Sequence, residues 1–145
     1  MLVTAGDTGH FNTMTASWGG FGVLWNKSVV WCVIRPQRYT REFIDTADNF
    51  TLTFFSEDYR DALWVCGTKS GRDCNKVAES GLTPIAGSIP NTTLFSEARI
   101  IMECRKIYTT DIDPLNFVDP DIDSNYPDKD YHRMYFGEIL RCAVK

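Results

Sequence analysis

Ser28-Val29-Val30-Trp31-Cys32-Val33-Ile34-Arg35 has the composition of a β-strand, and its centre is apolar at every position. A strand with one face in water alternates apolar and polar residues, so an unbroken apolar run is typical of a strand covered on both faces. We therefore expect a core strand here and a fold that is mainly β.

The segments on the N-terminal side of this run also have strand character. They are rich in β-branched and aromatic residues and are separated by turn residues. The expected strands are Leu2 to Ala5, Asn12 to Trp18 and Gly20 to Trp25. The glycines at 19, 20 and 22 lack the spacing of a nucleotide-binding loop and lie between two of these strands, so a bend is the favoured interpretation.

Short helices between strands are expected after residue 36. Thr40 is the expected cap of the first helix, whose apolar residues share one face: Phe43, Ile44 and Ala47. A strand follows from Asn49 to Phe55. Ser56 is the expected cap of a second helix, which carries an apolar face at Tyr59, Leu63 and Cys66. A third short helix is expected from Asp73 to Ser80, ended by Gly81.

The C-terminal third returns to the alternation of a half-buried strand. From Ala98 the apolar residues occupy one face, and Arg99, Glu103 and Arg105 occupy the other, which we expect to be in water. A final strand is expected from about Tyr131 to Val144, with Gly137 marking a bulge or a close approach of another backbone or a ligand.

Composition and charge narrow the classes of function. A chain of 145 residues with 43% hydrophobic and 23% charged residues is typical of one globular domain, here residues 1–145. The net charge of −4 argues against nucleic acid as a partner. No apolar run approaches the roughly 18 residues of a membrane helix, and the N-terminus lacks the features of a secretory signal. We expect a cytoplasmic protein with no membrane partner.

Neither the cysteines nor the histidines form a recognisable metal or catalytic motif. The five cysteines include no CxxC pair, so we expect free, structurally buried thiols and no zinc or iron–sulfur site. His10 lies in a turn, and no serine or cysteine has the surroundings of a nucleophile. A hydrolase is therefore disfavoured.

Residues 111–130, the acidic segment, hold seven of the nineteen acidic residues and three prolines. Asp119, Asp121 and Asp123 have the one, three, five spacing of a calcium loop. Ser124 replaces the glycine of the sharp turn and Asp130 replaces the final glutamate, so a solvated loop is favoured and calcium is the alternative. Outside this segment, fourteen basic residues face twelve acidic ones, which is compatible with a local anion site.

Two polar stretches point to a ligand. Asn12, Thr15 and Ser17 place an amide and hydroxyls along one strand and its end, just ahead of glycines that let a ligand approach the backbone. Arg35-Pro36-Gln37-Arg38-Tyr39-Thr40 places two cations and two hydroxyls where a strand meets a helix, a position that favours an anion such as phosphate. The stretch from Gly67 to Arg72 is a weaker anion signal. Ordinary surface polar residues at turns are the alternative for each.

Four blocks, in the order in which a known family carries them, cover almost the whole chain. They are Asn12-x-Met14-Thr15-Ala16-Ser17-Trp18, Arg35-Pro36-x-Arg38-Tyr39-Thr40, Ser70-Gly71-Arg72-Asp73-x-x-Lys76 and Tyr131-His132-x-Met134-Tyr135-x-Gly137-Glu138-Ile139. In these blocks the sequence resembles the flavin reductase-like family, the FMN-binding split-barrel group that includes flavoredoxin. The resemblance implies a split β-barrel with helical excursions, and a homodimer that holds FMN non-covalently near the subunit interface.

The resemblance also implies roles for individual residues. The flavin ring and its ribityl chain would be lined by Asn12, Thr15, Ala16, Ser17 and Trp18. The ribityl and phosphate end would be held by Arg35, Arg38, Tyr39 and Thr40, with Ser70 and Lys76 on the phosphate side and His132 near the cofactor.

The resemblance leaves three functions open. The preferred one is an NAD(P)H:flavin oxidoreductase, in which hydride passes from NADH or NADPH to FMN and the electrons leave to a flavin or protein acceptor. The alternative is a flavoredoxin-type electron carrier, which exchanges electrons with a redox partner protein without using nicotinamide. The third is an FMN-binding or storage module without turnover. No nicotinamide-binding motif is visible, so all three stay open.

Overall fold

The computed structural model describes all 145 residues and is built on one antiparallel sheet of seven strands. The strands are β1 (Leu2–Asp7), β2 (His10–Thr15), β3 (Gly19–Leu24), β4 (Lys27–Ile34), β5 (Asn49–Phe54), β8 (Ile100–Asp111) and β9 (Arg133–Val144). Their order across the sheet is β2-β1-β5-β8-β9-β4-β3. The two edge strands, β2 and β3, are consecutive in the chain, so the short segment 16–18 connects the two edges of the sheet.

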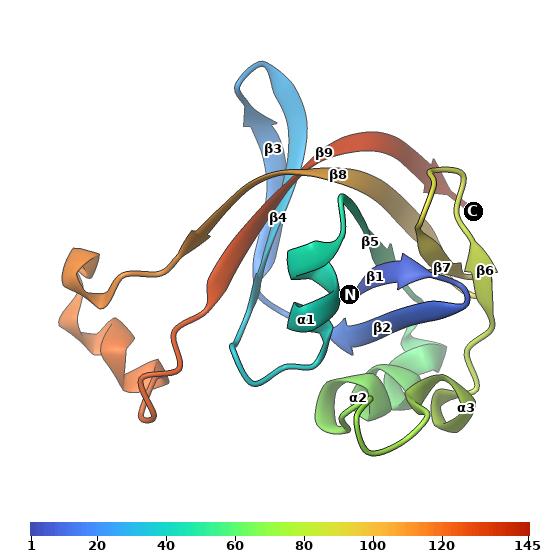
Figure 1. Ribbon diagram of the computed structural model, residues 1–145, viewed down its shortest axis with the longest axis horizontal. Helices are drawn as coiled ribbons and strands as arrows, with labels where there is room; N and C mark the ends of the chain where they lie inside the picture. Colours follow the sequence, from blue (N-terminus) through green and yellow to red (C-terminus); the bar gives the residue numbers. More distant parts are fainter.

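Short helices and a small second sheet fill the connections between these strands. They are α1 (Thr40–Thr46), the 3-10 helix η1 (Glu57–Tyr59), α2 (Arg60–Thr68), α3 (Lys76–Ser80), β6 (Pro84–Ala86) and β7 (Thr93–Phe95). Figure 1 shows β8 and β9 arching over the layer of β1, β2 and β5, with the β3–β4 hairpin rising beside them and α2 and α3 below. This is the mainly β split-barrel fold with helical excursions that the sequence predicts.

The apolar run that was predicted to be a core strand is β4. It pairs with β9 on one side and β3 on the other, and Val30, Cys32 and Ile34 are at most 1% exposed. They belong to the main hydrophobic cluster, to which Ile44 of α1 and Phe50 of β5 also contribute. Burial of these side chains supplies the main driving force for folding the sheet around this cluster.

Of the three predicted helix starts, Ser56 is confirmed as an N-cap position but makes no capping bond, and the other two differ from the structure. Thr40 is the first residue of α1, not its cap, and its hydroxyl accepts a bond from Asn12. Ser56 precedes η1, but its hydroxyl bonds the Asp58 carboxylate and caps no backbone N–H. The third helix begins only at Lys76, because Asn75 caps it by accepting from Ala78 N–H. Its predicted end at Gly81 is confirmed by a left-handed φ of 71° there.

The prediction that Glu103 faces water was wrong. Its side chain is 0% exposed and accepts bonds from Ile89 N–H and Thr92 Oγ1 at 2.9 and 3.1 Å, and from Arg141 Nη1 at 2.7 Å. The connection between β6 and β7 covers this face of β8, which the alternation within one strand does not indicate. A buried carboxylate with several donors is a satisfied charge, so Glu103 fastens the β6–β7 connection to the main sheet.

Gly137 is confirmed as a place of close approach. A Cβ at this position in β9 would lie 2.6 Å from Cζ of Phe50 and 2.8 Å from Cβ of Cys104. The ladder between β8 and β9 also shifts register between Lys106 and Tyr108, opposite this glycine. The bulge and the small residue together let the curved β9 pass directly over the core.

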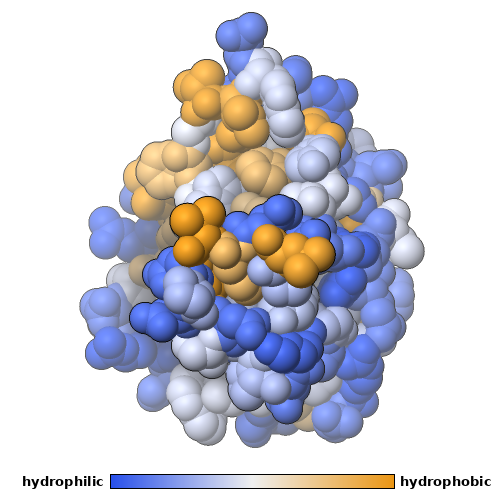
Figure 2. Space-filling view, turned by 90° about the vertical axis from the view of Figure 1, so that its left-hand side faces the viewer, coloured by the Kyte–Doolittle hydropathy of each residue, from blue (hydrophilic) through white to orange (hydrophobic).

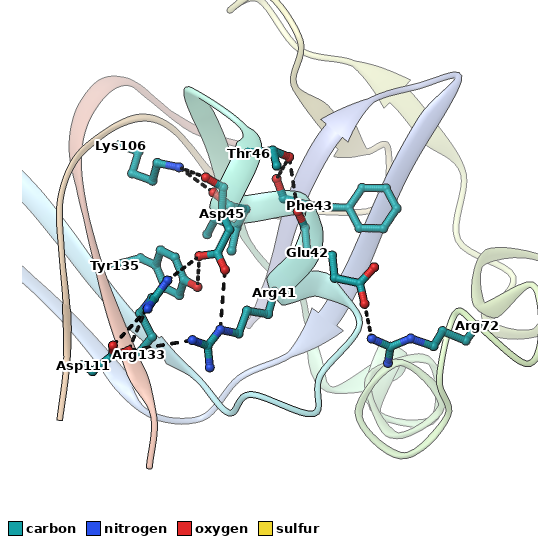
Figure 3. A network of polar contacts seen from close by, with 11 residues as sticks. Arg41, Glu42, Phe43, Asp45, Thr46, Arg72, Lys106, Asp111, Arg133 and Tyr135 are labelled. Atoms are coloured by element: carbon teal, nitrogen blue, oxygen red, sulfur yellow. Dashed lines mark hydrogen bonds and ion pairs between the residues drawn. The ribbon is translucent and has the colours of Figure 1, made fainter. Parts of the chain in front are cut away.

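Polar contacts fasten α1 to the long strands. Asp45 accepts a bond from the Tyr135 hydroxyl at 2.6 Å and pairs with Arg133 at 3.3 Å, while Lys106 donates to the carbonyl groups of Ile44 and Asp45 at 2.7 and 2.8 Å. Figure 3 shows this network on one side of α1 and the ion pair between Glu42 and Arg72 on the other. Residues 38–40, at the start of α1, are thereby held in a fixed position.

The acidic segment is irregular apart from two 3-10 helices, η2 (Pro114–Asn116) and η3 (Pro120–Asn125), as expected for a turn-rich loop. Asp119 caps η3 by accepting from Asp121 N–H, and Asp123 bonds Lys129 and Tyr131. No group of three or more histidine, cysteine or acidic side chains is arranged to hold a metal ion. Of the three aspartates with calcium-loop spacing, Asp119 serves the turn and Asp123 an ion pair.

All five cysteines are free thiols, as expected. Cys32, Cys66 and Cys104 are buried, Cys74 is half-buried and Cys142 is exposed, so the expectation of burial holds fully for three of the five thiols and is wrong at Cys142, near the end of β9. Among the helices, none combines the length and the apolar character that a membrane crossing requires.

Candidate cofactor site

The segment connecting the two edge strands lines a cavity of about 210 Å³. Seven of the residues proposed from the sequence meet there: Thr15, Ala16, Ser17, Trp18, Arg35, Arg38 and His132. Ala16 is held by Met1, since its N–H donates to the Met1 carbonyl at 3.0 Å and its own carbonyl accepts from the terminal amine at 3.3 Å. The N–H groups of Ser17 and Trp18 make no hydrogen bond within the chain. They are two backbone donors at the cavity wall.

A second cavity, of about 120 Å³, lies where the connection from β4 to α1 approaches α2 and α3. Five proposed residues line it: Arg38, Tyr39, Thr40, Ser70 and Lys76. Arg38 lines both cavities, so they meet at its side chain. The chain thus joins a polar compartment, lined by three cations and four hydroxyl groups, to a compartment beside Trp18.

Asn12 lines neither of these two cavities. Its side chain is 7% exposed, and its Nδ2 donates to the Thr40 hydroxyl at 2.7 Å. A Cβ at Gly71 would lie 2.1 Å from Oδ1 of Asn12, so the loop ahead of α3 can pass here only with glycine. Asn12 therefore fixes the position of Thr40 and of this loop.

Three cations line the second cavity: Arg38 and Lys76, which have no carboxylate partner, and Lys69, which is paired with Glu79. Lys76 is only 5% exposed, and its Nζ donates to the Cys66 carbonyl at 3.2 Å. Burial lowers the pKa of Lys76 to about 8, and the charge of Arg38 acts in the same direction. Two neighbouring cations that are withdrawn from water would be stabilised by an anion between them. Lys76 is still protonated at pH 7 and can pair with such an anion.

Arg35 is already bonded to the acidic segment. Its Nη1 donates to Oδ2 of Asp130 at 2.6 Å, and its Nη2 donates to the Asn125 carbonyl at 2.8 Å. Gln37 donates to the same Asp130 oxygen at 2.7 Å. Arg35 lines the first cavity, but its Nη1 and Nη2 groups bond the acidic segment and hold it against the end of β4. Of the cations that line the two cavities, Arg38 and Lys76 are the two without a carboxylate partner.

His132 and Trp18 pack together at the first cavity, with ring centroids 4.9 Å apart. Nδ1 of His132 lies 2.8 Å from the hydroxyl of the buried Tyr126. Burial lowers the pKa of His132 to about 4; the charge of Arg35 adds to the shift, and Asp130 opposes it. The imidazole is therefore neutral at physiological pH.

An apolar cavity of about 250 Å³ lies on the other side of the connecting segment. Thr15, Ala16 and Ser17 line both this cavity and the one beside Trp18. The apolar wall is formed by Met1, Phe21, Val30, Leu52, Phe54 and Met102. The segment from 15 to 17 therefore separates this apolar cavity from the cavity beside Trp18.

The residues present fit FMN by their chemistry. A dianionic phosphate needs cations and hydroxyl donors, which Arg38, Lys76 and the hydroxyl groups of the second cavity supply. A flavin ring needs apolar walls and a few directed donors, which the aromatic face of Trp18 and the free N–H groups of the connecting segment supply.

Two parts of the site were missed or left open by the sequence. Gly67, Thr68 and Lys69 line the second cavity, although the stretch from Gly67 to Arg72 had also been compatible with a surface turn. Its only signal was small residues near cations. Nothing in the sequence indicates that Tyr126 belongs to the site, because it lies in a segment whose composition is that of a solvated loop.

Comparison with solved structures finds the same fold. The chain is similar to flavoredoxin from Methanosarcina acetivorans (20% identity, TM-score 0.78, 99% of this chain and 67% of that one). It is similar to flavoredoxin of Desulfovibrio vulgaris (Miyazaki F) (23% identity, TM-score 0.76, 99% and 68%). It is also similar to nitrilotriacetate monooxygenase component B from Bacillus cereus (17% identity, TM-score 0.77, 99% and 67%). The comparison with curated proteins gave no significant match.

The family model described as "Flavin reductase like domain" matches residues 1–145, which is the full length of the sequence. The four sequence blocks, the split-barrel fold and this match agree. The chain belongs to the flavin reductase-like domain family.

Proposed function

We propose that this protein is an FMN-dependent oxidoreductase that takes hydride from NADH or NADPH and passes electrons to a flavin or protein acceptor. One observation carries the proposal: a phosphate-sized polar cavity and a cavity beside Trp18 meet at Arg38. A ligand that is anionic at one end and aromatic at the other would contact both. FMN has this chemistry, and membership of the flavin reductase-like family supports its choice.

The proposed roles follow from the positions of the side chains. Arg38 and Lys76 pair with the phosphate, with hydroxyl donors from Tyr39, Thr40 and Ser70. Asn12 acts indirectly by holding Thr40. The ring lies against the segment from Thr15 to Trp18, where backbone N–H groups meet its polar edge. Arg35 keeps the acidic segment closed against the site, and His132 contacts the ring ligand.

FMN would supply the redox chemistry itself, by accepting hydride and releasing electrons. The side chains of this chain then bind the cofactor, orient it and limit the access of water. No acid or base is assigned among them.

We also propose that two copies form a homodimer through the β3–β4 hairpin and the acidic segment. Figure 2 shows apolar side chains gathered on the face that includes both. The side chains of Phe21, Val23 and Trp25 are 73%, 79% and 55% exposed, and those of Leu115 and Val118 are 90% and 98% exposed. Exposed apolar residues in such numbers on one face favour a protein interface. β3 is also an edge strand with free backbone groups.

The second candidate is an electron carrier that holds FMN and exchanges electrons with a redox partner protein. The similarity to two flavoredoxin structures favours keeping it. It uses the same cofactor site and differs only in lacking direct reaction with nicotinamide.

The test is an anaerobic visible spectrum of the purified protein with FMN, recorded before and after adding NADH or NADPH, beside free FMN at the same concentration. Perturbed flavin bands that bleach faster than those of free FMN support the oxidoreductase and identify the donor. Perturbed bands that bleach only with dithionite or a reduced partner protein support the electron carrier. A spectrum identical to that of free FMN contradicts both.

A further inference from the structure

Tyr126 has an unusually enclosed position for a residue of the acidic segment. Its side chain is 2% exposed, although most of this segment lies in water. Its ring stacks with Phe117 at 6.2 Å, packs against Tyr131 at 4.9 Å and lies 5.1 Å below the guanidinium of Arg35. The segment therefore builds its own small aromatic core around Tyr126.

The only side-chain partner of the Tyr126 hydroxyl is Nδ1 of His132, at 2.8 Å. This bond can run in two directions: the phenol can donate to Nδ1, or Nδ1–H can donate to the phenol oxygen. If Nδ1–H donated, the phenolic proton would have no acceptor inside the protein. A buried donor without an acceptor is costly, so the phenol donates to an unprotonated Nδ1. Neutral imidazole then carries its proton on Nε2.

Nε2 makes no hydrogen bond within the chain, and His132 lines the cavity beside Trp18. A planar ligand in that cavity would meet an N–H donor whose direction is set by the bond on the opposite side of the ring. The charged groups near the imidazole are Arg35, Asp130 and Arg38, and burial together with Arg35 keeps the ring neutral.

We propose that Tyr126 is a positioning residue that fixes His132 as the Nε2–H tautomer, so that His132 donates a hydrogen bond to a carbonyl oxygen of the ring ligand. This inference rests on the proposed function. The carbonyl belongs either to the flavin ring or to the carboxamide of the nicotinamide donor. The acidic segment thus holds His132 in position through Tyr126, and the ion pair between Arg35 and Asp130 holds the segment against the end of β4.

The first test needs no cofactor. Long-range proton–nitrogen NMR of the imidazole side chains in the ligand-free protein reports the tautomer of each histidine, with His10 as the second signal. At pH 7 we expect His132 to be neutral with its proton on Nε2. A proton on Nδ1, or a protonated ring, in the wild-type protein overturns the proposal whether or not FMN binds.

The variants Tyr126→Phe and Tyr131→Phe form a matched pair. Each removes one hydroxyl from the same aromatic core, but the Tyr131 hydroxyl bonds Asp123 at 2.8 Å and does not touch His132. We expect Tyr126→Phe to give a mixture of tautomers and Tyr131→Phe to keep the wild-type signal. An unchanged tautomer in Tyr126→Phe, or the same change in both variants, overturns the positioning role.

Two binding measurements identify the ligand. The dissociation constant of FMN is measured by titration, and the KM for NADH or NADPH is measured with the FMN-loaded protein. Loss of one well-directed hydrogen bond predicts about a tenfold increase in one of the two for Tyr126→Phe, with little change in kcat. An increase in the dissociation constant of FMN assigns the carbonyl to the flavin. An increase in the KM for NADH or NADPH assigns it to the nicotinamide. No increase in either overturns the donor role of His132.

Discussion

Arg38 and Lys76 donate to neighbouring carbonyl groups at the C-terminal end of α2: Nη1 of Arg38 to Gly67 at 2.9 Å and Nζ of Lys76 to Cys66 at 3.2 Å. The carbonyl end of a helix carries partial negative charge, so α2 stabilises two cations that are otherwise withdrawn from water. α2 is thus one physical reason why two positive charges can be concentrated in the second cavity without a carboxylate beside them.

Replacing Lys76 with methionine should weaken FMN binding by about ten- to a hundredfold, because one charge-assisted bond to the phosphate is lost. Methionine keeps the length of the side chain, so the fold should survive. The dissociation constant is measured by quenching of flavin fluorescence. Arg60→Met is the matched control, because it removes a cation from the exposed, opposite end of α2. Equal affinity in wild type and Lys76→Met would contradict the assignment of the phosphate.

The pKa of Lys76 predicts opposite pH trends for binding and stability. Its pKa is about 8 in the folded protein, below the ordinary value of 10.5, so between these values the unfolded chain binds more protons. The free energy of unfolding of the ligand-free protein should gain a contribution that rises from pH 8 to pH 10.5. FMN affinity should fall over the same range, as the ammonium loses its charge. Both trends should flatten in Lys76→Met, measured by urea unfolding and FMN titration.

The sequence predicts the seven strands of the main sheet well, because period and composition are local properties, but β6 and β7, of three residues each, were not predicted. The run at Val29 to Ile34 is a strand in the structure, and Gly81 ends a helix as predicted. The errors arise where a residue distant in the sequence determines the hydrogen bonding or the burial of a side chain. The Thr40 hydroxyl accepts a bond from Asn12 of β2, and Glu103 is buried by Arg141 and the β6–β7 connection.

The same distinction applies to the candidate site. The twelve residues proposed from the sequence all line the two cavities except Asn12, which bonds Thr40. The bonds of Arg35 to Asp130 and of His132 to Tyr126 were not predictable, because they depend on how the acidic segment folds back. Its composition indicates solvation and gives no sign of the aromatic core that Tyr126 forms.

Gly137→Ala should destabilise the protein by about 1–3 kcal/mol, because the new methyl group would collide with Phe50 and with Cβ of Cys104. The midpoint of urea unfolding measures the change. Gly22→Ala in β3 is the control, since a Cβ there has nothing within 4 Å and should change stability by at most about 0.5 kcal/mol. Similar losses in both variants would show that backbone propensity, and not the contact with the core, is responsible.

Glu103→Gln should cost about 2–3 kcal/mol, because an amide group would turn a donor towards one of the donors that now bond the carboxylate. Burial raises the pKa of Glu103, but the bonds from Ile89, Arg141 and Thr92 outweigh it, so the pKa lies below 4.5. This carboxylate therefore contributes stability above pH 4.5 that is lost as the pH falls through its lowered pKa. Urea unfolding at pH 7 and pH 3 should show the wild-type advantage over Glu103→Gln shrinking with acid. A constant difference would contradict the prediction.

Val23→Lys should convert the proposed homodimer into monomers, because it places a charge in the centre of the exposed apolar face of β3, an edge strand. Val23 is 79% exposed in the single chain, so the substitution should leave its stability unchanged when measured at dilution. Sedimentation velocity gives the mass of wild type and variant. Val144→Lys is the control: this valine is 72% exposed but lies at the far end of β9, away from the hairpin in Figure 1. A wild-type protein that sediments as a monomer at micromolar concentration contradicts the dimer, and a Val23→Lys variant that remains dimeric moves the interface to another face.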